Sequence, residues 1–366
     1  MLLGAGHAHL FVLQALAHRH PADLNVTLVT PHTRQLYSGM VPGFVAGHYT
    51  LDDCVVPLEP LVAASRAKLL QTAAVGVDAA AKLVHLANGK TLHYDTLSID
   101  TGAVLDPERI EAMIPGAREN ALFVRPIEAF GALWPQVEQL AQGRALSVAV
   151  LGGGAAGVEL CMAVAHRLPH CQVTLVTGGP EPAAGYTDTV RARVRRALKK
   201  RNVTVLQEPC VRLHPGEVEL ASGARLACDA PILALGAQAA PWLQGSGLGL
   251  DAQGFVLVNN LQQSVSHPDV FAAGDAASRE DMALPKSGVH AVRAGPALAR
   301  NLLARTSGTP LTPHAPPART LNLLSCGGRE AIAAWGPWHA QGRWVWRWKD
   351  RIDRAFITKF RSGANL

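Results

Sequence analysis

Two glycine-rich segments have the pattern that binds the diphosphate of a dinucleotide. They are Gly4-Ala-Gly6-His-Ala-His9 and Gly152-Gly-Gly154-Ala-Ala-Gly157. Glycines let the backbone approach a diphosphate closely, and the free amides and positive dipole end of the following helix attract its charge. We therefore predict nucleotide contacts at Gly4, Gly6, Gly152, Gly154 and Gly157. His9 is assigned to the first site because it occupies the place of the third glycine.

A second segment is also repeated, once after each glycine turn. Val84–Ala103 and Val218–Ala237 share valine, leucine, alanine, glycine and aspartate at matching positions, and both end in Gly-Ala. A doubled unit of this kind favours two dinucleotide-binding domains in one chain. Thr101, Gly102 and Gly236, at the ends of the repeats, join the predicted contacts. Two nucleotides held by one protein indicate electron transfer between them.

The elements that must position these residues can be read from the pattern of apolar residues. We expect strands at Leu24–Thr30, Leu69–Val77, Lys82–Leu86 and Thr91–Leu97, with Asn88-Gly89 as a hairpin turn. In the second unit we expect a strand at Ala145–Leu151 and a helix at Val158–His166. Further predictions are strands at Gln172–Thr177, Val203–Glu208, Pro231–Leu235 and Val270–Asp275, and helices at Val190–Arg201 and Ser287–Ala304.

The residues at the ends of the second strands leave the nucleotide specificity open. These strands end in Thr30 and Thr177, where an acidic residue would bind both ribose hydroxyls. A threonine can make only a single hydrogen bond of that kind. Thr30 is predicted as a ribose contact, and no arginine follows Thr177 to hold a 2′-phosphate.

Composition and charge exclude several classes of protein. The chain has 366 residues, of which 48% are hydrophobic and 17% charged. Its six cysteines form no Cys-x-x-Cys pair, which argues against a dithiol centre or a zinc knuckle and fits a reducing cytoplasm. No histidine cluster has a complete set of metal ligands at a familiar spacing. Most of the +6 net charge lies between Arg343 and Arg361, which argues against a nucleic-acid surface. Met1 leads directly into the first turn, so we expect no signal peptide.

The combined motifs resemble the pyridine nucleotide–disulfide oxidoreductases. The resemblance rests on both glycine turns, Thr101-Gly102, Glu159, Gly236 and Val270–Asp275. It implies an α/β fold with two interleaved Rossmann-like domains, of FAD and NAD type, and a small C-terminal domain. The expected parts are residues 1–105 and 236–305 for FAD, 106–235 for NAD(P), and 306–366. It further implies FAD along the first unit with Val75, Gly274 and Asp275 among its contacts, NAD(P)H as substrate, and Glu159 near the nicotinamide.

Four longer segments resemble one subgroup of these flavoproteins. GAGHAHL, LYSGMVPGFVAGHY, PKSGVHAVRAG and RWVWRWKDRIDRAF are similar to flavoproteins fused ahead of selenide, water dikinase, which resemble type II NADH dehydrogenases and sulfide:quinone reductases. Cys54 stands alone where disulfide reductases have a pair. The quinone signature Ala-Gln-x-x-x-Gln is absent from Gly288–Arg293. Pro285–Val289 is closer to the sulfide-oxidising relatives, for which Cys161 and Cys326 are the candidate cysteines, although Cys161 has the pattern of a core residue.

Lys286 and His290 are the candidate catalytic residues beside Glu159. A cation near the pyrimidine ring of a flavin stabilises the negative charge of the reduced form, and Lys286 is predicted to supply it. His290 follows one helical turn later, either as a proton relay or as an ordinary surface histidine. The favoured activity is electron transfer from NAD(P)H through FAD to a second acceptor. The alternatives are oxidation of sulfide or selenide, and a non-catalytic flavin-bound module in selenium metabolism.

The C-terminal segment Trp344–Phe360 is predicted to form a basic amphipathic helix. Val345, Trp348, Ile352, Phe356 and Phe360 follow helical spacing, with basic residues opposite. Such a helix can rest on an anionic membrane surface, pair with a second subunit, or pack over the flavin site. We therefore expect a cytoplasmic protein, with peripheral membrane contact among the alternatives.

Overall fold

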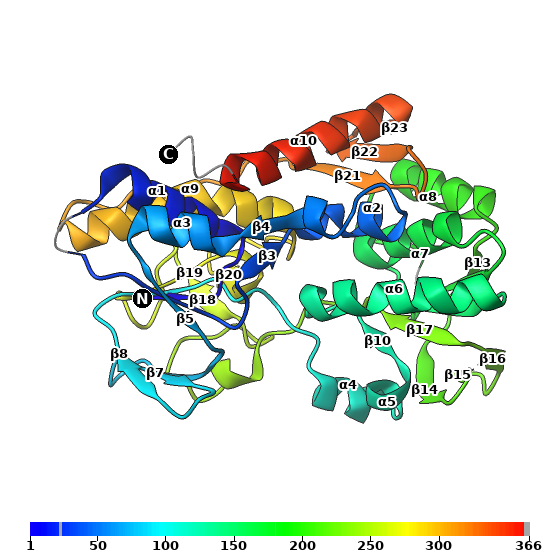
Figure 1. The fold of residues 1–366 in the computed structure, drawn as a ribbon, viewed down its shortest axis with the longest axis horizontal. Coiled ribbons are helices and arrows are strands. Elements are labelled where there is room, and N and C mark those ends of the chain that lie inside the picture. Colours follow the sequence, from blue (N-terminus) through cyan, green and yellow to red (C-terminus); the bar gives the residue numbers. More distant parts are fainter. Residues whose placement is uncertain (22–23, 180, 362–366) are drawn as a thin grey trace.

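The computed structural model describes residues 1–21, 24–179 and 181–361, which form two lobes built on parallel sheets (Figure 1). The first sheet has the order β19-β9-β1-β2-β5 and the second β10-β17-β11-β12-β13. The strands of the first sheet are β1 (Leu2–Leu3), β2 (Thr27–Thr30), β5 (Lys68–Gln71), β9 (Leu97–Ile99) and β19 (Val270–Ala272). Those of the second are β10 (Leu122–Phe123), β11 (Ser147–Leu151), β12 (Gln172–Val176), β13 (Thr204–Leu206) and β17 (Ala230–Leu233).

The two sheets repeat one plan, and this confirms the predicted α/β class. In each, a central strand (β1 or β11) leads through a glycine turn into a helix, α1 (His7–Arg19) or α7 (Ala155–Arg167), and then into the neighbouring strand β2 or β12. A three-stranded antiparallel sheet follows in both units. It is formed by β6 (Ala74–Asp78), β7 (Leu83–Leu86) and β8 (Thr91–His93) in the first, and by β14 (Cys210–His214), β15 (Glu217–Leu220) and β16 (Arg225–Ala227) in the second. The internal duplication of the sequence is therefore a duplication of structure.

Two of the predicted strands are each divided in the structure. Leu69–Val77 is β5 followed by β6, because the Thr72 amide hydrogen-bonds to Thr30 and Leu70 and the chain leaves the parallel sheet there. Thr91–Leu97 comprises β8 and the start of β9, since Tyr94 hydrogen-bonds to Lys82 between them. A run of β-forming residues shows extended chain, but not the point where it passes from one sheet to another.

Helices and short strands cover the sheets. α1 packs against α9 (Gly288–Thr306) and α3 (Leu58–Ser65) in the first lobe, and α7 packs against α2 (Val41–Val45) and α8 (Asp188–Lys200). The remaining elements are β3 (Arg34–Leu36), β4 (Val55–Pro57), α4 (Pro107–Met113), α5 (Ala117–Asn120), α6 (Ile127–Gly143), β18 (Val256–Val258), β20 (Ala277–Arg279) and the short helices η1 (Ser38–Met40), η2 (Asp52–Cys54), η3 (Pro241–Leu243) and η4 (Gly274–Ala276).

The C-terminal part joins the two lobes. An antiparallel sheet of β21 (Leu321–Ser325), β22 (Ala331–Trp335) and β23 (Trp338–Gly342) packs on α7 and α8, and α10 (Arg343–Arg361) then runs back over β4 (Figure 1). One face of α10 is buried, formed by Val345, Lys349, Asp353, Phe356, Ile357 and Phe360. Intramolecular packing therefore accounts for that face. No helix in the described part of the chain is long and apolar enough to cross a membrane.

Candidate functional site

A cavity of about 540 Å³ opens beside the first glycine turn. Its wall combines the turn itself, the ends of β2 and β9, and the segment that follows β19. The predicted contacts that line it are Gly4, Gly6, Thr30, Thr101, Gly102 and Asp275. Because parallel strands present their carboxyl ends at one edge, segments far apart in sequence meet here.

The residues of this cavity fit a dinucleotide cofactor. The Oγ1 atom of Thr101 and the Nε2 atom of His7 are buried without a hydrogen-bond partner in the structure. Buried polar atoms are normally paired, so both are free to meet a polar ligand. A Cβ atom built on Gly102 would meet no protein atom within 4 Å, which leaves room for a ligand near that backbone. The volume is in the range of cofactor sites.

Val75, His9 and Gly274 do not line the cavity; Gly274 lines a smaller one next to it. Val75 is 50% exposed on β6, and its neighbours Ala73 and Ala74 line the cavity instead. His9 lies behind the turn, fully buried, where its ring nitrogens hydrogen-bond to the Gly4 carbonyl (2.6 Å) and the Ser98 hydroxyl (2.8 Å). The ring fills the space that a third glycine leaves empty, and burial lowers the pKa of His9 to about 4.

Arg125 is a site residue that the sequence did not reveal. Its guanidinium donates to an Asp275 oxygen at 3.2 Å and to the Ala103 carbonyl at 3.1 Å, and both charged side chains line the cavity. Arg125 precedes α6 and is 150 residues from Asp275 in the chain. No local motif connects the two positions, so only the folded structure shows the ion pair.

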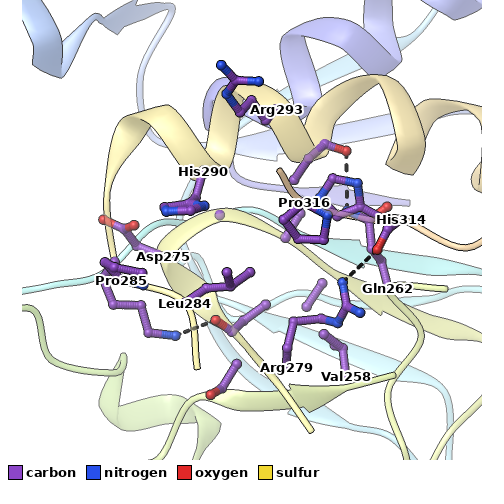
Figure 2. Close-up of a pocket in the computed structure, with 17 residues that line it drawn as sticks. Val258, Gln262, Asp275, Arg279, Leu284, Pro285, His290, Arg293, His314 and Pro316 are labelled. Atoms are coloured by element: carbon purple, nitrogen blue, oxygen red, sulfur yellow. Dashed lines mark hydrogen bonds between the residues drawn. The ribbon is translucent and has the colours of Figure 1, made fainter. Parts of the chain in front are cut away.

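Lys286 and His290 line a smaller neighbouring cavity of about 50 Å³. Figure 2 shows this cavity with His290 and Asp275 labelled. Asp275 lines both cavities. The Lys286 ammonium donates to the Ala277 carbonyl and lies 3.9 Å from the centre of the Phe255 ring. Burial lowers the pKa values of Lys286 and His290. The structure therefore brings the two predicted residues together in the smaller cavity, and neither lines the larger one.

The second glycine turn combines close packing with one open position. A Cβ atom on Gly152 would lie 2.2 Å from the Ala234 carbonyl oxygen, and one on Gly157 would lie 1.9 Å from the Gly152 oxygen. These two glycines are required by the fold itself. A Cβ atom built on Gly154 or on Gly236 would meet no protein atom within 4 Å, so the backbone at both glycines is accessible to a ligand. Thr177 lies at the end of β12, where its amide donates to the Leu206 carbonyl.

Glu159 on α7 is half-buried and feels the charges of two buried residues of α10, Lys349 and Asp353. Its carboxylate accepts the Ser325 amide at 2.7 Å, and burial raises the pKa of Glu159 to about 7, although the Lys349 charge opposes this. The Lys349 ammonium donates to the Gly39 carbonyl (2.6 Å) and to Asp353 (2.7 Å). Lys349 and Asp353 were not predicted as site residues because they resemble ordinary charges of an amphipathic helix.

The cysteines show no redox pair. All six are free thiols, and Cys161 and Cys326 are buried and lie outside both cavities. Burial raises the pKa of the Cys326 thiol to about 12, and the pKa of the Cys161 thiol is raised even further. Neither is a reactive thiolate in this conformation. In the described residues, no group of three histidine, cysteine or acidic side chains could hold a metal ion.

Comparison with known proteins gives consistent matches. The family described as pyridine nucleotide-disulphide oxidoreductase matches residues 1–295. Ferroptosis suppressor protein 1 of Taeniopygia guttata is 24% identical over 70% of this chain and 69% of its own length. An NADH dehydrogenase-like protein of Mycobacterium tuberculosis is 25% identical over 63% of this chain and 60% of its own. The crystal structure of sulfide:quinone oxidoreductase from Aquifex aeolicus superimposes with a TM-score of 0.82 at 18% identity, covering 99% of this chain and 91% of that one.

Proposed function

The chain belongs to the pyridine nucleotide-disulphide oxidoreductase family and is an FAD-dependent oxidoreductase, and we propose that it takes electrons from NAD(P)H and passes them to a second acceptor. The carrying observation is the cavity at the first turn, where six predicted dinucleotide contacts meet beside two unpartnered polar atoms. The similarity to an NADH dehydrogenase-like protein supports a nicotinamide donor. FAD, when bound, supplies the two-electron chemistry.

The side chains of this protein position the two nucleotides and their charges. Asp275, held by Arg125, presents a carboxylate to the first cavity, and Thr101 presents an unpaired hydroxyl. We propose that the nicotinamide nucleotide binds against the accessible backbone at Gly154 and Gly236. Lys286 contributes a positive charge in the neighbouring smaller cavity, which Asp275 also lines.

Anaerobic reduction of the bound flavin tests this assignment. Purified protein is expected to be yellow, and NADH or NADPH should bleach its absorbance near neutral pH. Sulfide and selenide are added separately to the same protein. Bleaching by sulfide or selenide alone would overturn the nicotinamide assignment, and no bleaching by any donor would favour a non-catalytic partner module.

Sulfide or selenide oxidation remains the second candidate function. The fold of the Aquifex aeolicus sulfide:quinone oxidoreductase and the Pro285–Val289 run favour it, as does the resemblance to flavoproteins fused ahead of selenide, water dikinase. The buried positions and raised pKa values of the Cys161 and Cys326 thiols weigh against a mechanism with two cysteines over the flavin. We therefore rank NAD(P)H first.

Glu159 lines neither cavity but lies near the start of α7, after the second glycine turn, and it is proposed as a proton-exchanging group for the nucleotide bound there. With a pKa of about 7, its carboxyl is protonated below neutral pH and can give up a proton within one turnover.

The turnover rate should therefore decline as pH rises through about 7. Glu159→Gln should lower this rate by about a hundredfold and remove the inflection near pH 7. Steady-state rates between pH 5.5 and 9 measure both. Glu138→Gln, which changes a surface glutamate paired with Arg167, is the matched control. An inflection that survives in Glu159→Gln would contradict this role.

We further propose that the outer face of the C-terminal part docks on an anionic membrane surface. Trp335 and Trp338 at the ends of β22 and β23, and Trp344, Trp348 and Ile352 on α10, are 38–53% exposed. Trp344 and Trp348 stack with ring centres 6.4 Å apart, and the exposed Arg343, Arg347 and Arg351 lie on the same helix. Interfacial aromatic rings beside basic residues are typical of helices that rest on anionic lipid.

Sedimentation with vesicles tests the membrane proposal. Vesicles rich in phosphatidylserine should pellet the protein at low salt and release it at high salt, because exposed charges are screened beyond about 10 Å at 0.1 M. The double variant Trp344→Ser, Trp348→Ser should stay in the supernatant with its FAD still bound. If the vesicles do not pellet the protein at low salt, the proposal of membrane docking is wrong. If the wild type is a dimer and the double variant is a monomer, the exposed tryptophans contact a second copy of the chain instead.

A further inference from the structure

A buried carboxyl group packs directly against the first glycine turn. Asp100, at the end of β9, is 2% exposed and accepts the His9 amide at 2.9 Å. Its Cγ atom would lie 2.4 Å from a Cβ atom on Gly6, and its Oδ1 atom 2.6 Å from one on Gly274. Asp100 is thus wedged between the turn and the segment that returns after β19, and it lines the 540 Å³ cavity.

The duplicated unit provides an internal comparison. Alignment of the repeats places Ala234 at the position of Asp100, and Gly157 at the position of His9. In the second unit the two small residues pack directly, since a Cβ atom on Gly157 would lie 3.5 Å from the Ala234 Cβ atom. The first unit instead has an acid and a buried histidine. The structure of the turn therefore does not require a carboxyl group, and another role must explain it.

The surroundings of Asp100 favour its neutral form. Burial, and then the charge of Asp275, raise its pKa to about 7, although the amides of His9 and Ala8 oppose the shift. From α1, His7 and His9 face this region, and burial lowers the pKa of each to about 4, so both are uncharged at neutral pH. From β9, Ser98 is uncharged, and Arg125, a cation that lines the same cavity, is paired with Asp275. No ion pair to Asp100 is seen in the described residues.

We propose that Asp100 couples flavin binding to proton uptake, so that the site retains FAD when this carboxyl is protonated and loses affinity when it ionises. The inference rests on the proposed binding of FAD at the first turn. The diphosphate of FAD carries two negative charges and would share the amino-terminal end of α1 with this carboxyl group, where an ionised Asp100 repels it. Below about pH 7 the carboxyl is already neutral and affinity is constant. Above it, binding must take up a proton, and affinity falls by about tenfold per pH unit.

Retention of FAD by the holoprotein as a function of pH tests this proposal. Holoprotein is diluted between pH 6 and 9, and released FAD is measured by its fluorescence after ultrafiltration. The apparent Kd of the wild type should be flat up to about 7 and then rise about tenfold per unit. Asp100→Asn keeps the shape of the side chain but cannot ionise, so its Kd should be independent of pH.

Asp52→Asn is the matched control. Asp52 is an exposed aspartate of η2 that lines neither cavity, and this variant should keep the wild-type pH dependence. If the apparent Kd of the wild type does not change with pH, the role of Asp100 is overturned by that measurement alone. The role is also overturned if the Kd of Asp100→Asn rises with pH as steeply as that of the wild type. Wild-type protein that holds no FAD even at pH 6 would overturn the proposed function and this inference together.

Discussion

Replacing Lys349 with alanine is expected to lower the free energy of unfolding by about 3–5 kcal/mol. The Lys349 ammonium pairs with Asp353 at 2.7 Å, and their side chains are only 10% and 6% exposed. Removal of the ammonium leaves the Asp353 carboxylate buried without its ion partner, together with an unpaired Gly39 carbonyl. The cost of an uncompensated buried charge exceeds the value of the ion pair itself, so the loss is large.

A second ion pair on the same helix provides the control. Arg354 and Asp350 have the same i,i+4 spacing, but 50% of the Arg354 side chain is exposed. Arg354→Ala should therefore change the free energy of unfolding by less than about 1 kcal/mol. Urea unfolding of the two variants measures the contrast. Equal effects would show that water or the Tyr37 hydroxyl compensates Asp353 once Lys349 is gone.

Helix α10 shows how far the apolar pattern alone predicts packing. Its spacing predicted an amphipathic helix, and Val345, Phe356 and Phe360 are buried as that pattern implies. Trp348 and Ile352 are exposed instead. Their expected place on the buried face is taken by Lys349 and Asp353, because a charged pair one turn apart can be buried when each partner satisfies the other. Residue polarity does not distinguish this arrangement from a solvated surface.

In the candidate site, too, local patterns were predicted from the sequence and contacts between distant residues were not. The glycine turns and the strands before them are local patterns, and the sequence predicted them. Asp100 and Arg125 act through contacts with residues 91 and 150 positions away, at His9 and Asp275. No periodicity or motif encodes such pairs. The Asp100 contact follows from the order of strands in the first sheet, which places the ends of β1, β9 and β19 side by side. The Arg125 contact instead joins the segment after β10, a strand of the second sheet, to the segment after β19.

The two glycine turns should respond differently to the same substitution. Gly6 and Gly154 precede α1 and α7 with nearly the same backbone, φ −65° and φ −72°. A Cβ atom on Gly6 would lie 2.4 Å from the Asp100 Cγ atom, whereas one on Gly154 would meet nothing within 4 Å. Gly6→Ala should therefore destabilise the protein by about 1–3 kcal/mol through overpacking and release FAD. Gly154→Ala should alter the free energy of unfolding by no more than about 1 kcal/mol.

The functional consequence of Gly154→Ala distinguishes the proposed donor from its rivals. The fold leaves the space beside Gly154 open, so an added methyl group obstructs only a ligand that approaches this backbone. We expect the variant to retain FAD and to be reduced by NADH or NADPH at least tenfold more slowly than the wild type. Stopped-flow bleaching of the flavin gives the rate, and flavin absorbance gives the FAD content. A donor that does not bind at the second turn, such as sulfide, should reduce both proteins equally. If NADH reduces Gly154→Ala at the wild-type rate, the proposal that the nicotinamide nucleotide binds at the second glycine turn is wrong.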